Sequence, residues 1–154
     1  MKNIIIGFLK MSERGTELAR RLMDRFQHRI LELSAPRANR IFIHMGREDL
    51  KEAVSFLVNE GFTHLSAITA LNAGDSLEIL YHLSGNGILV TLRVTLPPND
   101  FVIPTITDII PGALLHEREV HDLFGIKFKG NPDLRPLILP EDWPEGTYPM
   151  RRRK

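Results

Sequence analysis

The chain has 154 residues, 43% hydrophobic and 25% charged, which predicts one globular domain with a buried core rather than a disordered segment. It contains no cysteine, which excludes disulfides, thiol nucleophiles, thiolate metal ligands and the usual ligands of an iron–sulfur cluster. The net charge is +1, but without residues 151–154 the chain has 16 basic and 19 acidic residues, so the body is mildly acidic and the tip is basic.

The N-terminal residues 4–9 are apolar but end at Lys10. A bilayer crossing needs about 20 apolar residues. The stretch also lacks the small-residue cleavage site of a signal peptide. We therefore expect neither a membrane span nor a secretory signal here.

Helical and strand patterns then alternate along the chain. A serine can cap a helix over residues 12–26, whose apolar side chains recur every four residues. Two short β-like runs follow at residues 29–34 and 40–45. A second amphipathic helix covers residues 50–58, and Gly61 is suited to its C-terminal cap.

Three strands with alternating apolar and polar residues are predicted next, at residues 63–71, 76–84 and 88–96. Asn86 and Gly87 form the turn between the second and third of these strands. One face of the last two strands is apolar and consists of Leu77, Ile79, Tyr81, Leu83, Ile88, Val90, Leu92, Val94 and Leu96. The pattern predicts an α+β fold, with an antiparallel or mixed sheet whose buried face is covered by the helices.

The C-terminal part predicts one more helix and then an extended arm. Pro111 is suited to the first position of this helix, which should end at Phe124 before Gly125. We expect residues 1–125 to form the α+β domain and residues 126–154 an extended arm of the same structural unit. The arm contains Pro132, Pro136, Pro140, Pro144 and Pro149. Its apolar residues are too many for plain disorder, so we expect it to lie on another surface and to be flexible in the isolated chain.

The charged segment HEREVH of the third helix raises the question of a metal or acid–base site. His116 and His121 are five residues apart and point in different directions on a helix, so they cannot bind one metal ion together. Glu117 and His121 share a face, but two ligands alone do not make a site. Glu117 and Glu119 point to different sides, which argues against paired-carboxylate chemistry. A metal hydrolase remains an alternative that bound metal would reveal.

The helical projection separates the charged residues into two groups. Glu117 falls on the apolar side, together with Ala113, Val120, Leu123 and Phe124. Arg118, Glu119 and Asp122 gather on the opposite side. A carboxylate among apolar residues is costly unless it is hydrogen-bonded or paired, so we expect Glu117 to be buried and to anchor the arm or a partner chain, with Arg135 as its first candidate partner. The alternative is an ordinary amphipathic helix with a solvated charged face.

An ordered series of motifs runs to the end of the chain: Glu117-Arg118-Glu119, Asp122-Leu123-Phe124-Gly125-Ile126, Phe128, Gly130, Pro132-Asp133-Leu134-Arg135, Trp143 and Pro149-Met150-Arg151. This series resembles the signature of the thirty-kilodalton subunit family of respiratory complex I, which runs ERE, then D, a hydrophobic residue and FGI, then F, G and HPDLR. The resemblance is close over residues 113–151. The short form of the segment looks more like the versions found in energy-converting nickel–iron hydrogenases and formate hydrogenlyase-type complexes than like the NADH dehydrogenase form.

The resemblance implies a scaffold subunit without a cofactor or active site of its own, packed on a large catalytic subunit and near iron–sulfur subunits. It implies a position in the cytoplasmic peripheral arm of a membrane-bound oxidoreductase that contains iron–sulfur clusters and, in the hydrogenase branch, a nickel–iron site. The alternative is the same subunit of an NADH:quinone oxidoreductase. The residues expected at the subunit interface or in anchoring the arm are Glu117, Arg118, Glu119, Asp122, Phe124, Gly125, Phe128, Gly130, Pro132, Asp133, Arg135, Trp143, Tyr148 and Arg151.

The sequence departs from the family pattern at several positions. Asn131 stands where the respiratory members usually carry His, His121 where an aromatic residue is common, and Pro136 where a second Arg is usual. The basic tip at residues 151–154 replaces the usual KDF ending. It is interpreted as a solvated tail or a contact with an acidic partner. A nucleic-acid contact is a weaker alternative, because no basic stripe interleaved with aromatic residues accompanies it.

Overall fold

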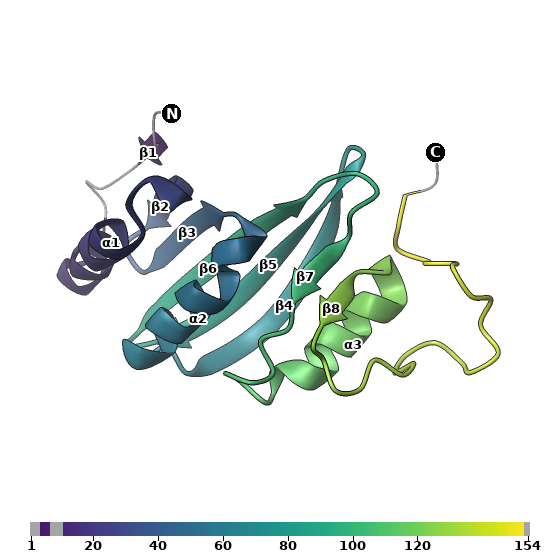
Figure 1. Cartoon of the computed structure of the whole chain (residues 1–154). Helices are drawn as coiled ribbons and strands as arrows, with labels where there is room; N and C mark the ends of the chain where they lie inside the picture. Colours follow the sequence, from purple (N-terminus) through teal and green to yellow (C-terminus); the bar gives the residue numbers. More distant parts are fainter. Residues whose placement is uncertain (1–3, 7–10, 153–154) are drawn as a thin grey trace.

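The computed structural model describes residues 4–6 and 11–152 (Figure 1). The helices and strands are β1 (Ile4–Ile6), α1 (Glu13–Phe26), η2 (Gln27–Arg29), β2 (Ile30–Arg37), β3 (Arg40–Met45), η3 (Arg47–Asp49), α2 (Leu50–Asn59), β4 (His64–Ala73), β5 (Ser76–Gly85), β6 (Ile88–Leu96), β7 (Val102–Pro104), α3 (Ala113–Phe124) and β8 (Lys127–Lys129). The rest of the predicted N-terminal apolar stretch, residues 7–9, and the last two residues of the basic tip lie outside the described residues.

Six strands form one mixed sheet in the order β1-β2-β3-β6-β5-β4. β1 is parallel to β2 and β3 is parallel to β6, whereas the β2–β3, β6–β5 and β5–β4 pairs are antiparallel. The parallel β3–β6 pair arises because α2 and the β4–β5 hairpin separate these two strands in the sequence. The chain is therefore an α+β protein, as the sequence predicts.

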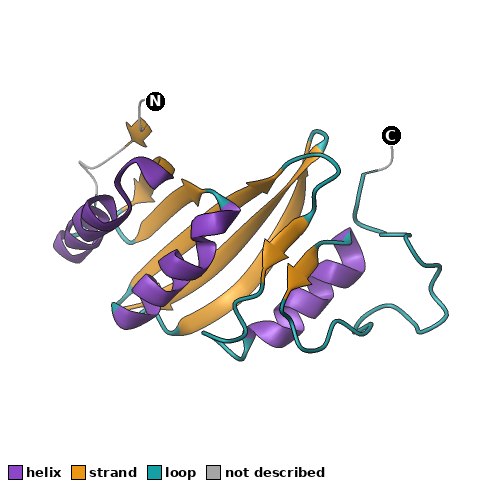
Figure 2. Ribbon diagram, viewed as in Figure 1, coloured by secondary structure: helices purple, strands orange, loops and turns teal. Residues whose placement is uncertain are grey.

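Helices α1, α2 and α3 all lie on the same side of the sheet (Figure 2). The alternation predicted for β5 and β6 is present, since every second residue from Leu77 to Leu83 and from Ile88 to Leu96 is buried under the helices. Thr91 points to the other face and is also buried, where its hydroxyl lies 3.0 Å from Nδ1 of His82. The hydrophobic core lies between this face of the sheet and the three helices, and α3 carries the contacts with the arm.

Local sequence signals account for the ends of these elements. The Ser12 hydroxyl caps α1 by accepting a hydrogen bond from the backbone of Gly15 at 3.1 Å. The β5–β6 turn places Asn86 and Gly87 at φ values of 54° and 77°, the conformation that such hairpins require. Gly125 ends α3 with φ 70°, in the left-handed conformation that glycine adopts without strain.

The structure differs from the prediction at the start of α3 and at the start of the arm. Pro111 lies in a turn, and the helix begins two residues later at Ala113. Residues 127–129, predicted as part of an arm without regular structure, form β8, which is parallel to β7. A pair of three-residue strands is too short to show a period in the sequence, which is why neither strand was predicted. Within residues 130–152 the structure has no further helix or strand.

Candidate interaction site

Glu117 is fully buried on the inner side of α3, which confirms the prediction from the helical projection. Its carboxylate accepts hydrogen bonds from the Thr105 hydroxyl at 2.6 Å, the Ile106 backbone N–H at 2.8 Å and the Asn131 side-chain amide at 2.7 Å. Burial raises the pKa of Glu117, while these three hydrogen bonds act in the opposite direction. The carboxylate thereby joins the loop after β7, helix α3 and the beginning of the arm.

The prediction that Arg135 pairs with Glu117 is wrong. Arg135 instead donates two hydrogen bonds, through Nε and Nη2, to the carboxylate of Asp133, each at 2.8 Å. This contact is the main reason why the pKa of Asp133 is held well below its ordinary value. The Arg135 side chain is 80% exposed. It keeps its hydration beside a carboxylate two residues away, whereas pairing with Glu117 would require burying the guanidinium group.

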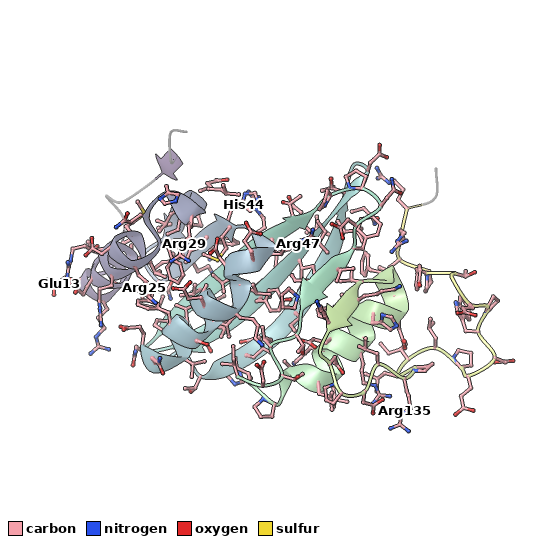
Figure 3. All side chains as sticks on the ribbon, viewed as in Figure 1. Glu13, Arg25, Arg29, His44, Arg47 and Arg135 are labelled. Atoms are coloured by element: carbon pink, nitrogen blue, oxygen red, sulfur yellow. The ribbon has the colours of Figure 1, made fainter. Side chains whose placement is uncertain are left out.

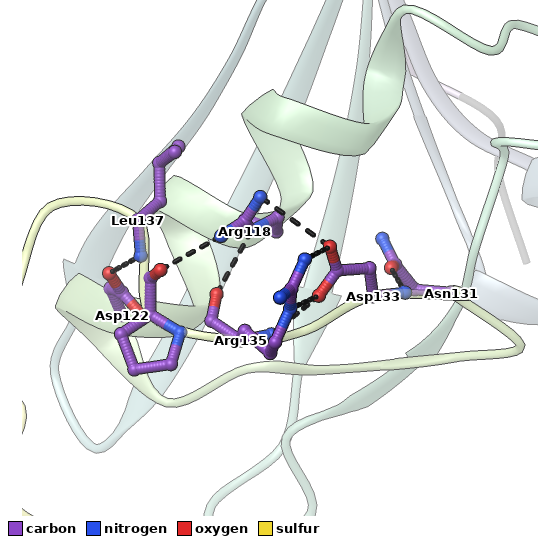
Figure 4. Close-up of polar contacts among 7 residues, drawn as sticks. Arg118, Asp122, Asn131, Asp133, Arg135 and Leu137 are labelled. Atoms are coloured by element: carbon purple, nitrogen blue, oxygen red, sulfur yellow. Dashed lines mark hydrogen bonds and ion pairs between the residues drawn. The ribbon is translucent and has the colours of Figure 1, made fainter. Parts of the chain in front are cut away.

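The arm runs along the outer side of α3 and contacts Arg118 and Asp122 (Figure 4). Arg118 donates to the backbone carbonyl oxygens of Arg135 at 2.9 Å and Pro136 at 2.8 Å. Its guanidinium group also lies 3.7 Å from the Asp133 carboxylate. A guanidinium group that binds two successive carbonyls fixes the direction of the chain as well as its position. Arg118 therefore anchors the arm, one of the two roles expected for it.

Asp122 is buried beneath the arm, which agrees with the arm-anchoring role expected for it and not with the alternative of a solvated charged face. One carboxylate oxygen, Oδ2, accepts hydrogen bonds from the backbone N–H groups of Leu137, Ile138 and Leu139 at 2.8, 2.9 and 3.2 Å. Successive N–H groups turned toward one anion form a concave binding site for its charge. Asp122 supplies the partner that this part of the arm, which has no strand neighbour, requires for its backbone.

The far end of the arm returns to α3 and is held by aromatic and cationic contacts. The Tyr148 ring packs on Gly125 so closely that a Cβ atom there would lie 2.4 Å from the ring. The Arg151 guanidinium lies 4.5 Å from the ring centre of Phe101 and 4.6 Å from that of Tyr148, within the range of cation–π attraction. Its Nε also donates to the carbonyl oxygen of Phe124 at 2.9 Å. Gly125 is thus required for close approach as well as for the helix end.

The β4–β5 end of the sheet supplies a last anchor. The Asn72 side chain donates to the carbonyl oxygen of Met150 at 2.9 Å and accepts from the backbone N–H of Arg152 at 2.9 Å. An amide that binds the backbone on both sides of one residue holds the chain in an extended conformation. The arm is consequently attached to the domain at both of its ends.

The middle of the arm remains accessible. Large apolar side chains there are exposed, with exposed fractions of 42% for Leu137, 53% for Ile138 and 38% for Trp143. The Trp143 indole N–H donates to the carbonyl oxygen of Thr147 at 2.8 Å, which fixes the ring while leaving it exposed. The structure thus presents apolar groups on an anchored segment.

The other predicted site residues divide into core and surface positions. Phe124 and Phe128 are buried in the hydrophobic core, so within this chain they stabilise the fold. Gly130 has φ 92° at the turn after β8. Pro132 is exposed and Glu119 is half-buried on α3.

The described residues contain no group of three histidine or acidic side chains that could hold a metal ion. His121 instead donates through Nδ1 to the carbonyl oxygen of Ile126 at 2.8 Å, across the end of α3. None of the helices in the described part of the chain combines the length and apolar character that a bilayer crossing needs.

A sequence model of the family described as "Respiratory-chain NADH dehydrogenase, 30 Kd subunit" matches residues 43–154. The chain belongs to this family. The resemblance of the ERE and DLFGI motifs is therefore confirmed, and the chain is a subunit of the complex I-like membrane respiratory complexes.

Relatives of this thirty-kilodalton family come from several respiratory complexes. The membrane-bound hydrogenase subunit beta of Pyrococcus furiosus is 35% identical over 73% of this chain and 68% of its own length. The NADH-quinone oxidoreductase subunit 5 of Thermus thermophilus is also 35% identical, over 73% of this chain and 60% of its own length. The chain thus spans less than two thirds of the Thermus relative. A chain of the membrane-bound sulfane sulfur reductase, an archaeal respiratory membrane complex, superposes with a TM-score of 0.80 at 25% identity, over 89% of this chain and 83% of that chain.

Several residues that hold α3 and the arm in place could not be identified from the sequence. Thr105 lies in the loop between β7 and α3, and Asn72 lies near the end of β4, and neither position carries a sequence signal for a contact with α3 or the arm. Phe101 follows a proline pair and carries no periodic signal. Asn131 was noted only as a departure from the family pattern, yet that departure was the available signal for a neutral partner of Glu117.

Proposed function

We propose that the chain is a non-catalytic scaffold subunit of a membrane-bound oxidoreductase of the energy-converting hydrogenase type. In this role it packs on the large catalytic subunit, on the cytoplasmic side of the membrane, and neighbours iron–sulfur subunits. The observation that carries the proposal is the 35% identity with the membrane-bound hydrogenase subunit beta, over most of both chains. The superposition on a chain of an archaeal respiratory membrane complex gives further support.

The arrangement of the arm supports docking rather than chemistry. Both ends of the arm are anchored through Arg118, Asp122 and Arg151, and its middle presents exposed apolar side chains. Such a segment is already ordered before it meets a partner, so binding costs little conformational entropy. The chain also lacks cysteine, so thiolate-bound clusters cannot carry electrons through it. We expect the isolated chain to show no visible chromophore and no turnover with NADH, quinone or hydrogen.

The test is purification of the native complex from membranes in mild detergent through an affinity tag on this chain. The proposal expects a large subunit and stoichiometric nickel to co-purify with the chain, and hydrogen-dependent dye reduction to follow the same fractions. A chain that elutes alone from solubilised membranes contradicts the proposal.

The second candidate is the corresponding subunit of an NADH:quinone oxidoreductase. It is favoured by the Thermus relative, which matches this chain at the same 35% identity. The same purification separates the two, because this candidate predicts a flavin-containing NADH-oxidising module and no nickel in the tagged complex.

A further inference from the structure

The arm bows away from α3 and returns to it, as Figure 1 shows for the yellow segment. Between the arm and the C-terminal end of α3 lies an open hollow of about 430 Å³. His121 and Asp122 line it from the helix, whereas Glu141, Trp143, Glu145 and Tyr148 line it from the arm. The hollow is therefore built from the same segment that the proposed function places against a partner.

The part of the arm that lines the hollow from residue 136 to residue 150 carries only negative charges. Residues 136–150 contain three acidic residues, Glu141, Asp142 and Glu145, and no basic residue. Within the described residues none of these three carboxylates forms a hydrogen bond or an ion pair, in contrast to Asp133 nearby. Lys127 also lines the hollow and is the one lysine or arginine among its lining residues. Glu141 and Glu145 thus supply two unpaired carboxylates to one concave surface.

The aromatic side chains of the hollow are suited to a cation. Tyr148 already binds a guanidinium group, since Arg151 of this chain lies 4.6 Å from its ring centre. Trp143, the residue type that attracts cations most strongly, is 38% exposed and is oriented by its bond to Thr147. The arm segment that lines the hollow is anchored at both of its ends, because Asp122 binds the backbone N–H groups of residues 137–139 and Tyr148 packs on Gly125. The ends of this segment are therefore positioned before a ligand arrives, which lowers the entropy cost of binding.

We propose that this hollow binds one basic side chain, Arg or Lys, of the large subunit, with the charge between Glu141 and Glu145 and the stem against Trp143. The inference rests on the proposed function, because it names the chemistry of the contact between the two subunits. Two unpaired carboxylates that line one concave surface together with the Trp143 ring match a cationic side chain in both charge and shape.

The experiment measures binding of the full-length chain to the purified large subunit of its native complex. The double variant Glu141→Gln/Glu145→Gln keeps the size of both side chains and removes their charge. We expect it to raise the dissociation constant about tenfold or more, and Trp143→Ala to raise it about tenfold. Asp142→Asn is the matched control, because Asp142 carries the same charge in the same loop but does not line the hollow. We expect it to change the constant less than about twofold.

The outcomes separate this inference from the proposed function. If the wild-type chain does not bind the large subunit, the proposed function fails. If the wild-type chain binds and the double variant binds equally well, the hollow holds no cation and the inference is overturned. An equal loss for Asp142→Asn and the double variant also overturns it, because general electrostatic attraction then replaces a seated side chain. Circular dichroism of each variant identifies a loss of folding, in which case Glu141→Gln and Glu145→Gln tested singly decide.

Discussion

Replacing Glu117 with alanine tests whether a buried carboxylate that is hydrogen-bonded but has no cationic partner ties the arm to the domain. The substitution removes the acceptor that Ile106 N–H and the Asn131 amide share. Thr105 loses the same partner but has Thr107 Oγ1 within 2.9 Å. Two donors, from two different segments, are therefore left without an acceptor.

The expected cost follows from these two donors. A buried donor without an acceptor costs about 1–3 kcal/mol, so two of them cost about 2–6 kcal/mol. Part of this is offset, because the variant no longer buries the carboxylate whose desolvation raises the pKa of Glu117. We expect Glu117→Ala to lower the free energy of unfolding by about 3 kcal/mol. Since no cation pairs with this carboxylate, the larger loss typical of a broken buried ion pair is not expected.

Chemical denaturation of the isolated chain measures this loss, with Glu119→Ala as the matched control on the same helix. Glu119 is half-buried, and its replacement should change the free energy of unfolding by less than about 1 kcal/mol. A value for Glu117→Ala within about 0.5 kcal/mol of wild type would refute the reasoning. The three hydrogen bonds would then contribute nothing net to stability.

Three further predictions concern the same elements. Because burial raises the pKa of Glu117 above 4.5, its contribution to stability is fully present below the unfolded pKa and is lost as the pH rises through the folded pKa. Denaturation at several pH values should therefore show wild type gaining stability over Glu117→Gln as the pH falls from neutral toward 4.5, and parallel curves would contradict this. Gly125→Ala should lower the free energy of unfolding by about 1–3 kcal/mol, because the alanine must adopt φ 70° and its Cβ atom would lie 2.4 Å from the Tyr148 ring. Gly112→Ala is the control: no atom lies within 4 Å of the added Cβ, so this change should lower the free energy of unfolding by less than about 1 kcal/mol. Asp122→Ala should speed hydrogen exchange of the backbone amides at residues 137–139, which lose their common acceptor, and unchanged exchange there would show that another group protects them.

The regular part of the fold could be predicted because its signal is local. The alternation in β5 and β6 gives the buried face directly, since a strand has a period of two. The burial of Glu117 follows in the same way from the helical period of α3. In each case the relevant neighbours lie within one element.

The contacts of the arm could not be predicted because they join segments that are distant in sequence. A helical projection treats the face opposite the core as solvent, so it cannot reveal that the arm covers Asp122. Charge complementarity alone favours Arg135 as the partner of Glu117, whereas neutral donors from Thr105, Ile106 and Asn131 bind the carboxylate in the structure. Figure 3 shows Arg135 at the edge of the molecule, pointing outward beside the arm. An exposed position keeps the Arg135 guanidinium group hydrated, whereas burial beside Glu117 would cost free energy of desolvation.

The anchoring also changes what is expected of the isolated chain. From its composition the arm was predicted to be flexible until a partner orders it. The hydrogen bonds from Arg118, Asp122 and Asn72 instead lead us to expect that both ends are ordered without a partner. Only the exposed middle of the arm is then left to respond to binding.

Hydrogen exchange of this chain, alone and within the purified complex, tests the central claim most directly. We predict slow exchange at residues 137–139 in both states, because Asp122 already binds these amides. Residues 141–146 should exchange rapidly in the isolated chain and slowly in the complex, where the large subunit covers them. Identical exchange of residues 141–146 in the two states would contradict the account, because the arm would then serve only its own domain.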